Sequence, residues 1–178
     1  MSPLGCLRKG HGRFDSPQFL NSSIRDVMSY WALVRPIWDK VDLRGRAESF
    51  LNQYDELPEA PRLLFAAHWV RSEIGNGGFA QLFSNSTGVL APEAVHAFVA
   101  LGMPRVADAL TRAMALLGDS YPRGRSARQK ALQGFRRRDA SAGARSFDAL
   151  EDEFFLLIDS ENGGFDAAAD QFAAGQGT

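Results

Sequence analysis

The sequence lacks several features that would assign a protein to a class at once. Its 178 residues include one cysteine, which excludes a disulfide framework and a zinc site built from thiolates. No run approaches about 18 consecutive apolar residues, so we expect no membrane-spanning segment. The charges nearly cancel, with 20 Lys and Arg against 21 Asp and Glu, so the net charge gives no indication of a nucleic-acid partner.

Motifs for catalysis and metal binding are also missing. There is no His-x-x-x-His pair, no Gly-x-Ser-x-Gly elbow and no Gly-Lys-Ser/Thr phosphate loop. The three histidines are scattered, and His68 is expected to be a hydrogen-bonded core residue. We therefore predict no metal, no cofactor and no catalytic residues; an enzyme that uses Glu73 in a polar pocket stays open as an alternative. No targeting segment is recognisable, which favours the cytoplasm.

The apolar residues recur with the helical period almost throughout. No segment alternates with period two, as a half-buried strand would. The segment 60–74 is apolar on nearly every face, which is typical of a helix at the centre of a bundle. Pro92 and Pro104 stand where helices begin. Two apolar stripes predict further helices. The first precedes the central helix, is interrupted at Pro36, and consists of Val27, Trp31, Val34, Trp38 and Val41. The second lies near the end of the chain and consists of Phe147, Leu150, Phe154 and Ile158.

These patterns predict one domain of the all-α class, a compact bundle of about seven or eight helices. The helical domain is expected over residues 23–174. Residues 1–22 are rich in Gly, Pro, Ser and charge without any period, so we expect them to form a flexible tail.

The most specific stretch follows the central helix. Its glycines allow a positive φ, so the chain is predicted to leave the helix sharply and start a short helix at Phe79. Asn76 is expected to cap that helix, Asn85 with Gly88 to end it, and the Glu73 carboxylate to bind free amides of the loop. Two interpretations remain open, a polar clasp that fixes the corner and a binding lip. The residues concerned are Glu73, Asn76, Gly77, Gly78, Phe79, Gln81 and Asn85.

In full, the pattern reads Trp69…Glu73-Ile74-x-Asn76-Gly77-Gly78-Phe79-x-Gln81-x-Phe83-x-Asn85-Ser86-x-Gly88. With Leu57-Pro58 and Arg62 before it, and Leu101-Gly102 and Phe147-x-x-Leu150-x-x-x-Phe154 after it, this pattern resembles the signature of the DNA-mimic-protein family, a helical domain long catalogued as of unknown function. The resemblance implies an all-helical fold, a non-enzymatic role and a homodimer. The family's characterised member is an acidic protein that imitates DNA and occupies a DNA-binding regulator.

This sequence departs from a DNA mimic in its charge distribution. Residues 101–146 carry ten Lys and Arg against three Asp and Glu, whereas residues 147–178 carry eight Asp and Glu and no Lys or Arg. We expect a binding protein that occupies a macromolecular partner, as an inhibitor, an immunity-type protein or a regulator-binding protein, through an acidic face with Asp148, Glu151 and Asp152. The alternative is a nucleic-acid-binding protein whose phosphate contacts are Arg128, Arg136, Arg137 and Arg138.

Overall fold

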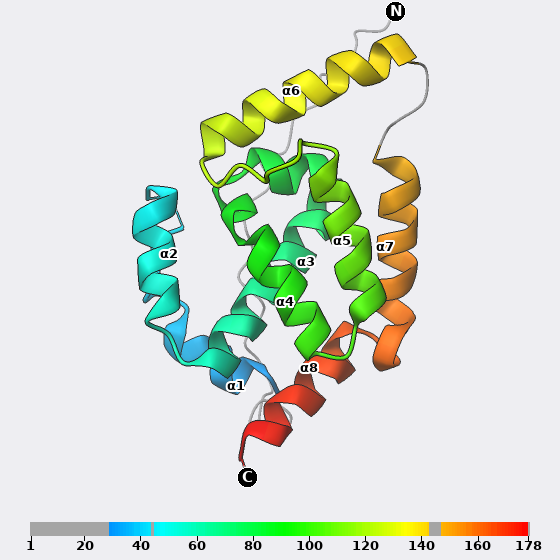
Figure 1. The fold of residues 1–178 in the computed structure, drawn as a ribbon. Helices are drawn as coiled ribbons and strands as arrows, with labels where there is room; N and C mark the ends of the chain where they lie inside the picture. Colours follow the sequence, from blue (N-terminus) through cyan, green and yellow to red (C-terminus); the bar gives the residue numbers. More distant parts are fainter. Residues whose placement is uncertain (1–28, 44, 143–146, 178) are drawn as a thin grey trace, which may run out of the picture.

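The structure is a computed structural model that describes residues 29–43, 45–142 and 147–177. The tail predicted for residues 1–22 lies outside the described residues. Within them the chain forms eight α-helices and four short 3-10 segments, and no strand occurs there (Figure 1). The prediction of an all-α bundle with seven or eight helices is confirmed.

The elements follow one another along the chain with short connections. In order they are α1 (Trp31–Val34), η1 (Arg35–Ile37), α2 (Ala47–Asp55), α3 (Glu59–Ser84), η2 (Ser86–Leu90), α4 (Ala91–Ala100), α5 (Pro104–Ala115), α6 (Arg125–Ala142), α7 (Asp148–Ser160), η3 (Glu161–Gly163), α8 (Phe165–Ala174) and η4 (Gly175–Gly177).

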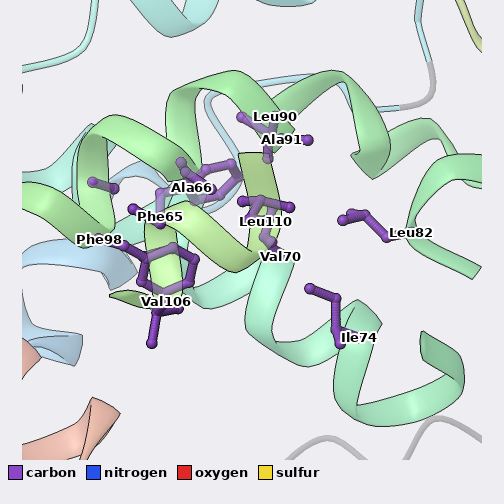
Figure 2. Close-up of a cluster of buried hydrophobic side chains, with 14 of the residues drawn as sticks. Phe65, Ala66, Val70, Ile74, Leu82, Leu90, Ala91, Phe98, Val106 and Leu110 are labelled. Carbon is purple, nitrogen blue, oxygen red and sulfur yellow. The ribbon is translucent and has the colours of Figure 1, made fainter. Parts of the chain in front are cut away.

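Helix α3 lies at the centre of the bundle because its sequence is apolar on nearly every face. It contacts α1, α4, α6, α7 and η2. Figure 2 shows the core where α3, α4 and α5 meet, with Phe65 and Val70 beside Phe98 and Leu110. All four side chains are fully buried, and burial of each stabilises the fold by about 1.5–3 kcal/mol relative to exposure.

The outer helices surround this centre. Helix α4 packs on α3, α5 on α4, and α7 on α5. Helix α6 crosses one end of the bundle, and α8 lies at the other end (Figure 1). Pro92 and Pro104 stand in the first turns of α4 and α5, as their positions in the sequence predict. None of the described helices is both long enough and apolar enough to cross a membrane.

The first part of the described chain forms two short helical segments, as the interruption at Pro36 predicts. Helix α1 is one turn, and Pro36 stands in the first turn of the 3-10 segment η1 that follows it. Val34 and Val41 are buried as the stripe predicts, and so is Ile37, which lies outside the stripe. Trp31 and Trp38 lie against each other with ring centroids 5.4 Å apart. This segment therefore delivers two tryptophans to the surface of α3.

Candidate functional site

Helix α3 is broken at Gly77 and Gly78, inside the Asn-Gly-Gly-Phe sequence. Gly77 has an extended φ of −174°, and Gly78 has φ 70° and ψ −173°, a combination that is nearly restricted to glycine. The helix resumes at Phe79, whose backbone N–H donates to Oε1 of Glu151 at 2.8 Å. A Cβ on Gly78 would overlap that carboxylate. The predicted positive φ is confirmed, and it makes room for a side chain from α7.

Two predicted contacts of this corner are wrong. Asn76 does not cap the helix at Phe79, because its Nδ2 donates to Oγ of Ser72 at 3.5 Å, one turn earlier. The Glu73 carboxylate does not bind the amides of the corner, because its partners are side chains further along the chain. Both roles fall to Glu151, which is 72 residues from Phe79 in the sequence. No local pattern around the glycines could identify it.

Glu73 is the buried carboxylate of this region, with 9% of its surface exposed. Its Oε1 accepts a hydrogen bond from Oγ1 of Thr87 at 2.6 Å, and its Oε2 accepts from Nε2 of Gln81 at 2.9 Å and Nδ2 of Asn85 at 2.8 Å. All three donors are uncharged, and none of the ion pairs between described residues includes Glu73. Since an ionised carboxylate accepts about four hydrogen bonds, Oε1 keeps acceptor capacity.

These hydrogen bonds join three pieces of chain. Glu73 stands before the corner, Gln81 after it, and Thr87 in η2. The structure thus brings together Glu73, Gln81 and Asn85 from the signature, adds Thr87, and leaves Asn76 outside the hydrogen-bonded cluster. The sequence could have indicated a role for Thr87, because it carries the one polar side chain between Ser86 and Glu93.

A cavity of ≈ 780 Å³ opens beside this cluster, and Glu73 lies in its wall. The opposite wall is the segment 38–43, between η1 and α2. This segment adds the carboxylates of Asp39 and Asp42 and the ammonium group of Lys40 to the lining. Among the described residues, the cavity wall therefore holds three carboxylates and one ammonium group.

Two indole rings form an aromatic part of the same wall. Trp38 and Trp69 are stacked, with ring centroids 5.0 Å apart and planes at 20°. Nε1 of Trp69 is closed off from solvent and has no hydrogen-bond acceptor among the described residues. A buried donor without an acceptor costs about 1–3 kcal/mol, and such groups are rare in folded proteins. This N–H is the unsatisfied group of the site.

His68 lies behind the tryptophans and does not line the cavity. Its Nδ1 is 3.0 Å from Oη of Tyr30, and its ring centroid is 4.6 Å from that of Trp31. Burial disfavours the imidazolium form and, with the charge of Arg71, lowers the pKa of His68 to about 4. The predicted hydrogen bond of His68 is confirmed, whereas the residue is half-buried and does not belong to the fully buried core. Among the described residues, no group of three His, Cys, Asp or Glu is placed to hold a metal ion.

Comparison with known families identifies the signature. The family model described as DMP19-like protein matches residues 55–175. The chain belongs to the DMP19-like protein family. No curated protein and no solved structure matches the chain. The matched residues include Glu73, its three donors and the glycine corner, whereas the segment 38–43, the other wall of the cavity, precedes them.

The prediction that Arg128 contacts phosphate is wrong. In this DMP19-like protein Arg128 is fully buried, with 0% exposed, and it donates to the carbonyl oxygens of Phe83 at 3.3 Å and Asn85 at 2.7 Å. It also donates to the carbonyl of Arg123. Burial lowers its pKa. The guanidinium satisfies carbonyls at the end of α3, where a cation is favoured by the helix dipole.

The sequence carried a signal for the burial of Arg128. It lies three, four and seven residues before Ala131, Leu132 and Phe135, and Leu132 and Phe135 form the buried stripe of an otherwise charged helix. Gly88 completes the arrangement, because a Cβ there would overlap both a backbone carbonyl and Nε of Arg128. Of the other predicted phosphate contacts, Arg136 and Arg137 are exposed on α6, and the side chain of Arg138 lies outside the described part.

The predicted acidic face of Asp148, Glu151 and Asp152 needs one correction. Asp148 and Asp152 are exposed, but Glu151 is turned inward to Phe79. Glu161, after α7, also serves a helix start, since its carboxylate accepts from the backbone N–H groups of Arg105 at 3.1 Å and Val106 at 2.9 Å. Asp170 of α8 likewise accepts from the backbone N–H of Tyr30 at 2.8 Å, so three of the eight C-terminal carboxylates bind backbone N–H groups of distant segments.

The second Asn-Gly-Gly-Phe, at residues 162–165, makes a similar corner. It ends α7 and begins α8. Gly164 has φ 88° and ψ 163°, close to the backbone of Gly78, and it too precedes a buried phenylalanine, Phe165. Nδ2 of Asn162 donates to the carbonyl of Leu101 at 2.8 Å. The same four residues thus restart a helix at two places in the fold.

Proposed function

We propose that this DMP19-like protein is a non-enzymatic binding protein that occupies a basic surface of a partner protein through the outer face of α7. The observation that carries the proposal is the exposure of two neighbouring apolar side chains there. Phe155 is 40% exposed and Leu156 is 68% exposed. Large apolar side chains at the centre of a charged surface are typical of the residues that anchor protein interfaces.

The aspartates of α7 surround these two side chains. Asp148, Asp152 and Asp159 are all exposed, and with Phe155 they stand at intervals of three or four residues. Because a helix rises 1.5 Å per residue, they form a ridge along one side of α7, with Asp152 and Asp159 about 10 Å apart along the axis. Phe155 lies within this ridge, between Asp152 and Asp159.

The charge of the region favours a basic partner. No Lys or Arg occurs in residues 147–178. The basic side chains that neighbouring helices supply pair with other acids: Arg112 lies 2.6 Å from Glu153, and Arg71 lies 3.4 Å from Asp166. A negative surface steers a positive partner during association and rejects acidic competitors.

The resemblance to the DNA-mimic-protein family also implies a non-enzymatic role, which we keep as part of the proposal. Family membership adds the expectation of a homodimer, which we retain as a proposal alongside the protein partner.

The test compares variants in affinity capture of the tagged protein from its native lysate, with and without nuclease. The double variant Phe155→Ser, Leu156→Ser should fail to capture a partner protein that the wild type still captures after nuclease treatment. Val99→Ser is the matched control, because Val99 is an exposed apolar residue of α4, 55% exposed, away from α7. Removal of charge by Asp148→Asn, Asp152→Asn and Asp159→Asn should weaken capture and reduce its salt dependence.

The control for charge is a triple variant of exposed acids elsewhere, Glu48→Gln, Glu56→Gln and Asp119→Asn. If both triple variants lose the partner equally, net charge and not the α7 face governs binding, and the proposal fails. Capture that nuclease abolishes would instead favour nucleic-acid binding through the exposed arginines of α6. Unchanged capture by the Phe155→Ser, Leu156→Ser variant also refutes the proposal.

A further inference from the structure

We propose that the cavity between the segment 38–43 and α3 binds a guanidinium group, either of a free small molecule or of an arginine side chain. The lining shares no residue with the outer face of α7, and α2 and α7 lie at opposite sides of the bundle (Figure 1). The inference therefore does not rest on the proposed function, and either can fail alone.

The first support is the charge of the cavity. Glu73 is buried in its wall without a cationic partner among the described residues, and Oε1 accepts from Thr87 alone. Asp39 is exposed nearer the solvent and also lines the cavity. A cation that reaches Glu73 gains a charge-assisted hydrogen bond at low dielectric, and Asp39 attracts it from solution.

The second support is the preorganisation of the carboxylate. Gln81 and Asn85 hold Oε2, and Thr87 holds Oε1, so the group does not lose side-chain entropy when a ligand binds. A carboxylate that served only as a structural clasp needs no opening to solvent. Here the clasp forms one wall of a cavity of ≈ 780 Å³, which is the size of a small-molecule site.

The aromatic wall selects a guanidinium over an ammonium group. A guanidinium is planar, stacks on indole rings and is less strongly hydrated than an ammonium group, so it enters a half-buried site at lower cost. Trp38 and Trp69 supply the rings. Its five N–H donors need several acceptors, and the side-chain oxygens of Asn76 and Asn85 stand in the lining beside Glu73.

The unsatisfied N–H of Trp69 is a further observation in favour of a ligand. Nε1 has no acceptor among the described residues although it is closed off from solvent. Because Nε1 is closed off from solvent, an acceptor of the ligand, such as the backbone carbonyl of an arginine residue, would reach it only if the indole turned toward the cavity.

The test is calorimetric titration of the full chain with blocked amino acids, followed in parallel by tryptophan fluorescence. The probes are N-acetyl-arginine amide, its citrulline analogue, which is a neutral isostere of the guanidinium, and its lysine analogue. We expect saturable binding of the arginine compound, with the citrulline and lysine compounds weaker by about tenfold or more. A blocked Gly-Arg-Gly peptide distinguishes the sources: tighter binding than the single residue assigns the site to polypeptides, and equal binding assigns it to a small molecule.

The matched variants are Glu73→Gln and Glu56→Gln. Glu56 is an exposed acid outside the cavity lining, so its change should leave the affinity as it is, whereas Glu73→Gln should lower it about tenfold or more. If Glu73→Gln does not fold, Asp39→Asn serves as the second variant. It should lower the affinity for the arginine compound about two- to threefold at low salt and leave it unchanged at high salt. Equal binding of the arginine and citrulline compounds, or binding of no arginine compound at all, overturns the proposal, and equal binding of the lysine compound overturns the choice of guanidinium.

Discussion

Replacing Gly78 with alanine tests how the corner of α3 is built. The backbone of Gly78, at φ 70° and ψ −173°, costs a residue with a Cβ about 1–3 kcal/mol. The new methyl group also overlaps the carboxylate of Glu151, which must then release the N–H of Phe79. Loss of a hydrogen bond at a helix start costs about 1 kcal/mol more. We therefore expect Gly78→Ala to lower the free energy of unfolding by about 2–4 kcal/mol.

Gly75 supplies the matched control three residues earlier. It lies in the regular part of α3, and a Cβ there meets no atom within 4 Å. Gly75→Ala should therefore raise the free energy of unfolding by about 0.5–1 kcal/mol. Both changes remove the same freedom from the unfolded chain, so their difference isolates the corner. Urea titration followed by far-UV circular dichroism measures both, by linear extrapolation.

A double-mutant cycle separates the two parts of the cost. With Glu151→Ala in place the overlap is gone, so Gly78→Ala should lose only the backbone part, about 1–3 kcal/mol. Strict additivity of the two changes would contradict the contact with Glu151. A Gly78→Ala variant as stable as Gly75→Ala would refute the whole account of the corner.

Two further predictions concern basic side chains that the fold shields from solvent. Arg128→Met keeps much of the side-chain volume but leaves the carbonyls of Phe83 and Asn85 without their donor, so urea titration should show that the free energy of unfolding falls by about 3 kcal/mol. The control Arg136→Met, on the exposed side of α6, should change it by no more than about 0.5 kcal/mol. Equal losses would refute the structural role of Arg128. Because burial lowers the pKa of His68 from 6.5 to about 4, the unfolded chain binds a proton in this interval that the folded chain does not, so stability is complete above about pH 6.5 and falls toward pH 4. Between pH 7 and pH 5 the wild type should lose about 2 kcal/mol more than His68→Gln, and equal losses in urea titrations at the two pH values would contradict the prediction.

Much of the fold follows from the sequence because its determinants are local. The spacing of apolar residues and the positions of Pro92 and Pro104 act within a few turns of one helix, so they predict the helices and the central place of α3. The interruption at Pro36 could be anticipated in the same way, because a proline restricts the backbone within one turn, and the chain there forms two short helical segments.

The site was predictable only in part, because its decisive contacts join residues far apart in the sequence. The signature residues Glu73, Gln81 and Asn85 are close in sequence, and their grouping could be anticipated. The partner of Phe79 is 72 residues away, and the two acceptors of Arg128 at the end of α3 are 43 and 45 residues away. Charge alone placed Glu151 and Arg128 on the surface, since nothing in composition distinguishes a carboxylate that binds a helix start from one in water.

Two carboxylates of the C-terminal segment, Glu151 within α7 and Glu161 directly after it, also affect how the protein folds during synthesis on the ribosome. Glu151 completes the start of the second half of α3, and Glu161 completes the start of α5. Both helix starts are synthesised well before their acceptors, with sequence separations of 72 and 56 residues for Phe79 and Arg105. The nascent chain must therefore hold its central helix with an unfinished corner until the last quarter of the protein has emerged. Contacts of such long range form slowly and expose apolar surface in the meantime, so translation of the C-terminal segment is the step at which this bundle becomes a stable native fold.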